Sequence, residues 1–158
     1  MTVYSFVVRK AKPEDAEAIY NILQEAFRKY MTDTSLKGSI EALEETIEQI
    51  KKETLRQHVF IACINDEPVG TIRYEIDEKR EAHISRFGVR LDFHNIGIGK
   101  SLMNLVDSEI EALGVKKAYL YSASKYTDLI KFYYGRGFYI ESTSTDKGYV
   151  RAKLVKEF

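Results

Sequence analysis

The chain has 158 residues, of which 44% are hydrophobic and 30% charged, and 24 basic and 24 acidic side chains leave no formal net charge. This composition is that of a globular domain and excludes a disordered or collagen-like chain. No overall field attracts nucleic acid or an anionic membrane. The longest apolar run, 59–64, is far shorter than the roughly 20 residues of a membrane span, and no apolar signal region precedes it. We therefore expect one soluble, cytoplasmic domain over residues 1–158, with neither nucleic acid nor membrane as a partner.

Cysteine and histidine are too sparse to predict disulfide or metal chemistry. The single cysteine, Cys63, has no partner for an internal disulfide, and its apolar neighbours indicate a small core residue rather than a nucleophile. The three histidines, His58, His83 and His94, lie far apart and lack the spacing of metal ligands. We predict no metal site.

The first third of the chain predicts one strand and two amphipathic helices. Aromatic and β-branched residues over 4–9 indicate a strand, and Pro13, followed by two acidic residues, marks a helix start. Apolar residues recur at helical spacing over 16–30 and again over 40–50, on either side of a loop over 31–39. Four glutamates lie outside the second apolar stripe, and we interpret them as a solvated face: Glu41, Glu44, Glu45 and Glu48.

The rest of the chain predicts an antiparallel meander followed by alternating helices and strands. Gly114 suits a left-handed helix cap, and polar turns separate the strands. The expected elements are strands over 58–64, 69–76 and 82–90, a helix over 98–113, a strand over 115–121, a helix over 127–136, and strands over 138–143 and 149–154. The order is therefore β-α-α-β-β-β-α-β-α-β-β, which indicates one mixed α/β domain.

A glycine-containing loop, HNIGIGKS at residues 94–101, lies between the last strand of the meander and the following helix. Gly97 and Gly99 allow backbone amides to approach a ligand closely, and amides at a helix N-terminus bind anions such as phosphate. Lys100 and the Ser101 hydroxyl could add to that binding. The alternative is a tight connector whose glycines only form the turn.

Three classes of ligand compete for this loop. A Walker A phosphate loop requires a glycine where this chain has His94, and a dinucleotide fingerprint requires a third glycine where it has Leu102. Both motifs therefore lack a required glycine. The third candidate is the pyrophosphate arm of coenzyme A.

With this loop, the chain resembles the GNAT superfamily of N-acetyltransferases, whose cofactor motif is Gln or Arg, two residues, Gly, one residue, then Gly or Ala. Gly97 and Gly99 match that motif, and His94 departs from its first position. A second family signature, Phe or Leu, Tyr, three residues, Gly, Phe, is matched by FYYGRGF at 132–138. The resemblance covers essentially the whole chain and implies a central, mostly antiparallel sheet with helices on both faces.

The resemblance implies direct transfer of an acetyl group from acetyl-CoA to a primary amine in a ternary complex. It implies that the amide of Val89 stabilises the negative charge on the thioester oxygen. The residues expected to bind the coenzyme are Phe87, Gly88, Val89, His94, Asn95, Ile96, Gly97, Ile98, Gly99, Lys100, Ser101 and Phe132.

The resemblance also implies which residues move protons. The family often places a base on the strand before the cofactor loop, and here that residue is His83, whose ordinary pKa of about 6.5 suits proton acceptance near neutrality. Glu81, on the same strand face, is the second candidate, and some family members use only waters. Tyr133 occupies the position of the acid that protonates the coenzyme thiolate. The alternatives are a half-buried strand histidine and a packed tyrosine.

The acceptor is expected to be an amine-bearing small molecule, a peptide N-terminus or a lysine. Tyr126 stands where the family often has asparagine, and seven tyrosines between Tyr119 and Tyr149 could line an aromatic site. The acidic N-terminal half slightly favours a cationic acceptor, and the resemblance allows a homodimer. A non-catalytic acyl-CoA-binding or regulatory module is the alternative function, motivated by the departures at His94 and Tyr126. A nucleotide-binding protein is the third hypothesis.

Overall fold

One seven-stranded sheet organises the computed structural model, which describes residues 6–38 and 40–158. The strands lie in the order β1-β2-β3-β4-β5-β7-β6, and every neighbouring pair is antiparallel except β4 and β5. Their bounds are β1 Phe6–Lys10, β2 His58–Ile64, β3 Glu67–Ile76, β4 Ala82–Val89, β5 Lys117–Ala123, β6 Tyr139–Ser144 and β7 Arg151–Glu157.

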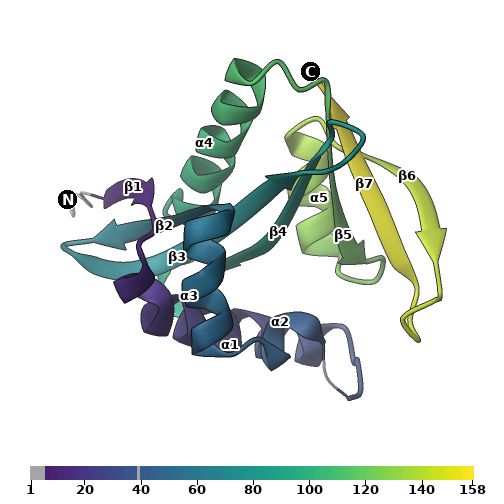
Figure 1. Ribbon diagram of the computed structural model, residues 1–158. Coiled ribbons are helices and arrows are strands. Elements are labelled where there is room, and N and C mark those ends of the chain that lie inside the picture. The colour runs from purple at the N-terminus through teal and green to yellow at the C-terminus, as the bar shows by residue number, and fades with distance from the viewer. Residues whose placement is uncertain (1–5, 39) are drawn as a thin grey trace.

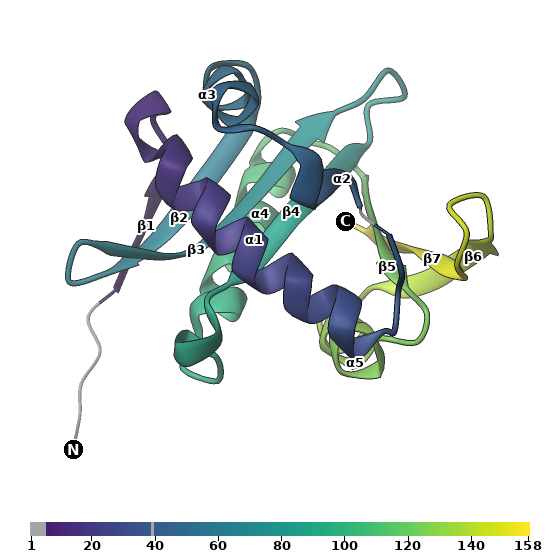
Figure 2. The same ribbon diagram turned by 90° about the horizontal axis from the view of Figure 1, so that it is seen from below.

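Helices cover both faces of this sheet (Figures 1 and 2). α1 (Ala16–Asp33) crosses one face diagonally beside α3 (Ile47–Arg56), and the short α2 (Glu41–Glu44) lies between them in the chain. α4 (Ile98–Ala112) covers the other face, and α5 (Thr127–Gly135) contributes to the same core as α4. Within the described residues, no helix is both long enough and apolar enough to cross a bilayer.

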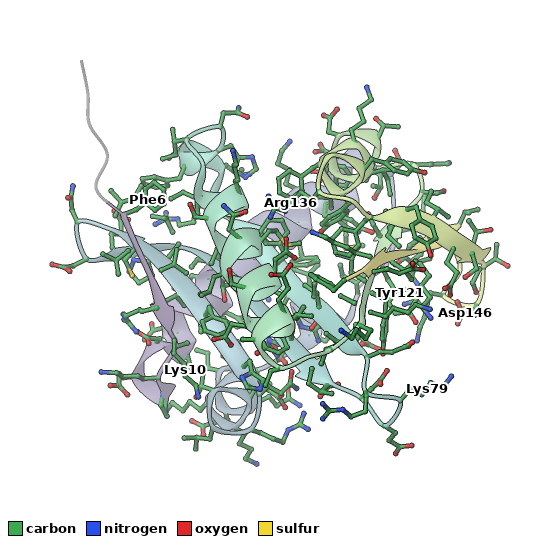
Figure 3. The ribbon with its side chains drawn as sticks, turned by 90° about the horizontal axis from the view of Figure 1, so that it is seen from above. Phe6, Lys10, Lys79, Tyr121, Arg136 and Asp146 are labelled. Atoms are coloured by element: carbon green, nitrogen blue, oxygen red, sulfur yellow. The ribbon has the colours of Figure 1, made fainter. Side chains whose placement is uncertain are left out.

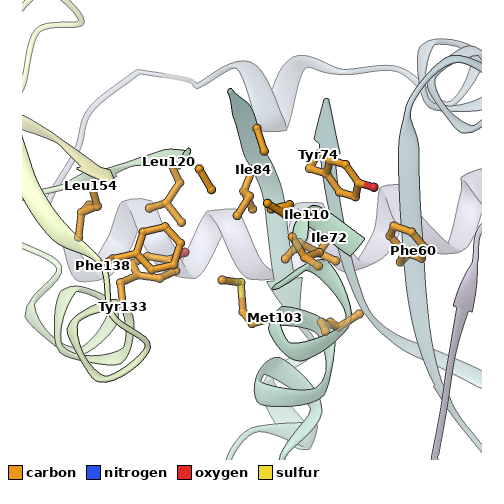
Figure 4. Close-up of a cluster of buried hydrophobic side chains, with 14 of the residues drawn as sticks. Phe60, Ile72, Tyr74, Ile84, Met103, Ile110, Leu120, Tyr133, Phe138 and Leu154 are labelled. Atoms are coloured by element: carbon orange, nitrogen blue, oxygen red, sulfur yellow. The ribbon is translucent and has the colours of Figure 1, made fainter. Parts of the chain in front are cut away.

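Two hydrophobic clusters lie on opposite faces of the sheet. The larger one packs beneath α4 and α5, and Figure 4 shows its members from β3, β4, β5 and β7 around Met103 and Phe138. The smaller one packs beneath α1 and α3. Successive side chains of a strand point to opposite faces, so Phe60 belongs to the larger cluster and Val59 and Ile61 to the smaller. This two-sided burial explains why β2 is a continuous apolar run.

The sheet splits between β4 and β5. These strands pair only at Ala82 with Ala118 and at His83 with Tyr119, and then diverge (Figure 1). β4 also carries one extra residue relative to β3, and Arg86 at this bulge has a φ of +53°. From Ile84 onward, the edge of β4 that faces β5 has no strand partner among the described residues.

The predicted order of elements is confirmed, except that the helix expected over 40–50 is two helices. The chain is extended at Glu45, and Thr46 then caps α3, because Thr46 Oγ1 accepts a hydrogen bond from Gln49 N at 3.2 Å. The break turns Glu45 inward, where its side chain is 11% exposed and pairs with Arg73. The prediction that Glu45 belongs to a solvated face is therefore wrong.

Several predicted boundaries shift by a few residues. α1 continues to Asp33 into the expected loop, and β5 and β7 each begin two residues later than predicted. Residues 4 and 5 of the first predicted strand and Ser39 of the predicted loop lie outside the described residues. Gly114 has the left-handed φ of +70° expected of a residue that ends a helix.

Candidate active site

A cavity of about 960 Å³ occupies the split between β4 and β5. Residues 83–89 of β4 form its floor, and the remaining lining comes from α1, α2, the loop before α4, β5, α5 and the turn between β6 and β7. A volume of this size accommodates a small-molecule ligand. We call the part formed by 87–89, 94–95 and 97–100 the loop wall.

The loop wall supplies backbone donors at the start of α4. Gly97 has a φ of +94°, a conformation that glycine adopts without strain. Because the first amides of a helix have no intrahelical acceptor, the N–H groups of residues 98–100 are available to a ligand. Ser101 N instead donates to Gly97 O at 3.0 Å, so this predicted amide is already used within the helix. The wall therefore offers three donors at the positive end of a helix dipole.

Gly99 is required for close packing between α4 and β4. A Cβ atom at this position would lie 3.1 Å from Phe87 Cζ. His94 holds the loop before α4 against β4, because its Nε2 lies 3.0 Å from Val89 O at the end of that strand. The side chain of Ile96 packs against the larger core cluster, and this residue does not line the cavity.

The free edge of β4 forms the other part of the loop wall. Arg90 N donates to Val69 O on β3 at 2.8 Å. Because successive N–H groups of a strand point to opposite edges, the Val89 N–H points to the edge that β5 leaves open. Gly88 packs closely against α1, since a Cβ atom added at this glycine would lie 3.0 Å from Ala26 Cβ. Helix packing therefore accounts for this glycine, and the bulge of β4 lies at Arg86 instead.

Tyr133 reaches the cavity from α5 and is only 4% exposed. Its ring packs against Phe138 at a centroid distance of 5.7 Å and against Phe87 at 6.5 Å. Figure 4 shows Tyr133 beside Phe138. Phe132 also lines the cavity and stacks on Phe87 at 5.9 Å. Burial raises the pKa of the Tyr133 phenol, so the group keeps its proton near neutral pH.

His83 lies at the last point where β4 and β5 pair. Its ring stacks on Tyr119 at a centroid distance of 4.8 Å and meets Tyr121 edge-on at 5.7 Å. Burial is the largest cause and lowers the pKa of His83; the carboxylates of Glu75 and Asp77 raise it, and the positive charges of Arg86 and Arg151 lower it. The imidazole is therefore mostly neutral at pH 7 and can accept a proton.

Glu81 occupies a different environment. It precedes β4, does not line the cavity, and has its carboxylate 3.7 Å from Lys117 Nζ. Of the three predicted catalytic residues, the structure therefore brings His83 and Tyr133 to one cavity and leaves Glu81 outside it.

The rest of the lining, which we call the side-chain wall, comes from segments far apart in the sequence. Besides His83 and Tyr133, the charged residues and tyrosines of this wall are Lys29, Tyr30, Glu41, Glu44, Arg86, Tyr121, Tyr126, Lys147, Tyr149 and Arg151. The tyrosine cluster was the only sequence signal for this wall. Four of its seven members line the cavity: Tyr121, Tyr126, Tyr133 and Tyr149. No motif pointed to the charged residues.

Tyr126, at the position where asparagine was expected, connects α1 to α5. Its ring stacks on Tyr30 at a centroid distance of 5.2 Å, and its hydroxyl donates to Asp33 Oδ2 at 3.2 Å. Tyr30 in turn accepts a hydrogen bond from Ala123 N at the end of β5. These contacts fix one side of the cavity entrance.

The acidic residues, histidines and the cysteine outside the cavity give no sign of further chemistry among the described residues. Across the part of the chain that the structure describes, no group of three or more His, Cys, Asp or Glu side chains could hold a metal ion. Cys63 is buried, as predicted, and burial raises the pKa of its thiol.

The sequence matches the model of the Acetyltransferase (GNAT) family over residues 16–138. The chain belongs to this family. As a GNAT acetyltransferase it is an enzyme that uses acetyl-CoA as the acetyl donor, and the anion-binding amides of the loop wall fit the pyrophosphate of that coenzyme. None of the curated protein sequences matches this chain significantly.

Solved structures of other GNAT proteins share the fold. PaiA N-acetyltransferase from Thermoplasma acidophilum, in complex with coenzyme A, has a TM-score of 0.84 and 21% identity, covering 98% of this chain and 99% of that one. Ard1 from Thermoplasma volcanium has a TM-score of 0.79 and 21% identity, covering 96% and 97%. The ribosomal-protein-S18-alanine N-acetyltransferase from Escherichia coli has a TM-score of 0.72 and 17% identity, covering 97% and 94%. These GNAT structures confirm the mostly antiparallel sheet flanked by helices.

Proposed function

We propose that this GNAT acetyltransferase moves the acetyl group to a primary amine by direct attack, with His83 as the base and Tyr133 as the acid. The observation that carries the proposal is that both side chains line one cavity with the free edge of β4 and the N-terminus of α4. A neutral base and a protonated acid are the forms that such a reaction requires.

His83 prepares the amine. An amine that arrives as ammonium has no lone pair and cannot attack the thioester carbonyl. His83 accepts one proton from it, directly or through a water, since its lowered pKa keeps the imidazole mostly neutral at pH 7. The position of Glu81 outside the cavity favours His83 as the base.

Val89 and Tyr133 act on the thioester. The Val89 N–H, which points to the open edge of β4, donates a hydrogen bond to the carbonyl oxygen as negative charge builds there. Tyr133 donates its phenolic proton to the coenzyme sulfur as the C–S bond breaks. The second proton of the attacking nitrogen, released as the amide forms, restores the phenol. The products are the acetylated amine and free coenzyme A.

Release of the coenzyme thiol in the presence of an amine panel tests the proposal. Tyr133→Phe should lower kcat by about 100-fold or more and leave the Kd for acetyl-CoA unchanged. Tyr134→Phe is the matched control, because Tyr134 is the next residue of α5, is 50% exposed and does not line the cavity. Equal kcat values for both variants would remove the acid role. Binding of acetyl-CoA without transfer to any amine would favour the non-catalytic module.

A further inference from the structure

Two arginines of the side-chain wall line the same cavity as the candidate base, and their charges act on it. Arg86 follows His83 by three residues on β4, and Arg151 begins β7. The Arg151 Cζ atom lies 4.1 Å above the Tyr121 ring, which itself touches the His83 ring. Figure 3 shows Tyr121 on the same side of the molecule as the turn between β6 and β7, where Asp146 lies. Both arginines therefore lie near the site of proton transfer.

The charge of Arg86 is only partly balanced. The carboxylate nearest to it belongs to Glu45, whose Oε1 lies 3.5 Å from Arg86 Nε. Both oxygens of that carboxylate already accept hydrogen bonds at 2.9 Å from Arg73, which is buried. Two guanidinium groups therefore share one carboxylate, and one positive charge is left over. Such a charge, withdrawn from water, is costly unless an anion accompanies it.

Arg151 is held by an aromatic ring rather than by a carboxylate. Its closest acidic group, Asp146, lies 3.9 Å away, beyond hydrogen-bond distance, and accepts instead from Ser144 Oγ at 2.6 Å. Among the described residues, no hydrogen bond is made by the guanidinium of either Arg86 or Arg151, and the Nε atoms of both are buried. Because both residues line the cavity, the terminal NH2 groups of their guanidinium groups are the donors that a ligand there can reach.

The remaining charges of the side-chain wall do not neutralise these two arginines. Lys147 lies 3.8 Å from Glu41, so these opposite charges face each other across the cavity entrance. Lys29 forms an ion pair with Asp33 at 2.8 Å. The one acidic lining residue left is Glu44, which is exposed on α2. The charged lining residues that act on His83 are therefore Arg86 and Arg151, whereas the carboxylates of Glu75 and Asp77, which also act on it, do not line the cavity.

We propose that Arg86 and Arg151 form an anion-binding subsite, and that the acceptor is an amine that also carries a carboxylate or phosphate group. The planar guanidinium fork matches both anions in shape and charge. This inference rests on the proposed acetyl transfer to an amine and names the class of that amine. It differs from the cationic acceptor favoured by the acidic N-terminal half, because most of that acidity lies outside the cavity.

Paired acceptors test the subsite. Each standard amino acid is compared with its own carboxamide, which removes the negative charge but also lowers the pKa of the amine, so kcat/KM is expressed per free amine. Phosphoethanolamine is compared with ethanolamine in the same way. We expect kcat/KM for the best anionic acceptor to exceed that of its neutral partner by roughly tenfold or more, as for a charged hydrogen bond. The amino acid and phosphate series distinguish the two anions.

Arg151→Gln should abolish this preference, mainly through KM, and Arg151→Lys should retain part of it because the charge stays while the fork is lost. Lys153→Gln is the matched control: Lys153 is two residues along the same strand and lies 4.7 Å from the ring of Tyr119, yet it does not line the cavity. That variant should keep the wild-type preference. Thermal unfolding of all three variants checks that they fold.

The outcomes separate the two proposals. Equal or faster transfer to the neutral partners or to polyamines would overturn the anionic subsite and leave the acetyltransferase proposal intact. A preference for anions that survives in Arg151→Gln would overturn the assignment to this residue. Coenzyme binding with no transfer to any acceptor, charged or neutral, would overturn the proposed function, and the subsite with it.

Discussion

The two walls of the cavity offer different kinds of groups to a ligand. The loop wall comes from one short stretch, 87–100, and presents mainly backbone N–H groups at a strand edge and a helix start. The side-chain wall gathers residues from six separate segments and presents charged and aromatic groups. Under the proposed function, the loop wall holds the acetyl donor through backbone geometry, and the side-chain wall selects the acceptor.

The largest expected effect is on stability and concerns Glu45, whose carboxylate pairs with Arg73 and lies beside Arg86 of the side-chain wall. Glu45 joins the α2–α3 junction to β3, and replacing it with Gln would leave the side chain of Arg73, only 4% exposed, without its carboxylate. We expect Glu45→Gln to lower the free energy of unfolding by about 3 kcal/mol, measured by urea denaturation.

Glu48→Gln is the control for this change. Its side chain is 77% exposed and pairs with Lys51 on the helix surface. This variant should change the free energy of unfolding by less than about 0.5 kcal/mol. Equal losses in both variants would show that Glu45 does not anchor the wall.

The second expected effect tests whether His83, which lies between the two walls, is the base. His83→Gln should lower kcat/KM by roughly 100-fold at pH 7. In the wild type, activity should fall as the pH drops through the pKa of His83, because the protonated imidazole cannot accept a proton. Burial places that pKa below its ordinary value of about 6.5.

His58→Gln is the matched control for this profile, because His58 also stacks on a tyrosine, Tyr74, at 4.4 Å but does not line the cavity. It should keep the wild-type pH profile. If His83→Gln kept the acidic inflection as well, a different group or a water would be the base.

The smallest expected effects are on acetyl-CoA binding, and they compare a substitution that disturbs the backbone of the loop wall with one that removes a side-chain charge from it. Gly99→Val would press against Phe87 and should weaken acetyl-CoA binding by roughly tenfold. Lys100→Gln removes an exposed charge next to the same amides and should weaken binding by only about threefold. Calorimetry measures the Kd for acetyl-CoA in both variants. A larger loss of affinity in Lys100→Gln than in Gly99→Val would contradict recognition by the backbone.

These contrasts explain how much of the site could be predicted from the sequence. Gly97 and Gly99 lie in one continuous motif, so every residue of the loop wall is among those predicted, whereas Ile96 and Ser101 were predicted in addition but do not line the cavity. Arg86 and Arg151 come together only because β4 and β5 diverge, and no local pattern encodes that divergence. Their contribution to the cavity therefore required the tertiary structure.

The fold was predicted well where periodicity was unambiguous. The helix break at Glu45 was missed although its signal was present, since Thr46 and Gln49 form a capping box, with Thr46 N donating to Gln49 Oε1 at 2.8 Å. The apolar residues over 40–50 keep helical spacing across the break, so the pattern predicted one continuous helix. A cytoplasmic location and a homodimer stay predictions.

Thermal unfolding with acetyl-CoA, coenzyme A, ATP, GTP and NAD tests most directly that the cavity is a coenzyme A site. A ligand at about 100 times its Kd adds about 2.7 kcal/mol, which corresponds to roughly 5–10 °C in Tm for a domain of this size. We predict this shift with acetyl-CoA and coenzyme A alone. No shift with these two, or a shift only with a nucleotide, would contradict the account.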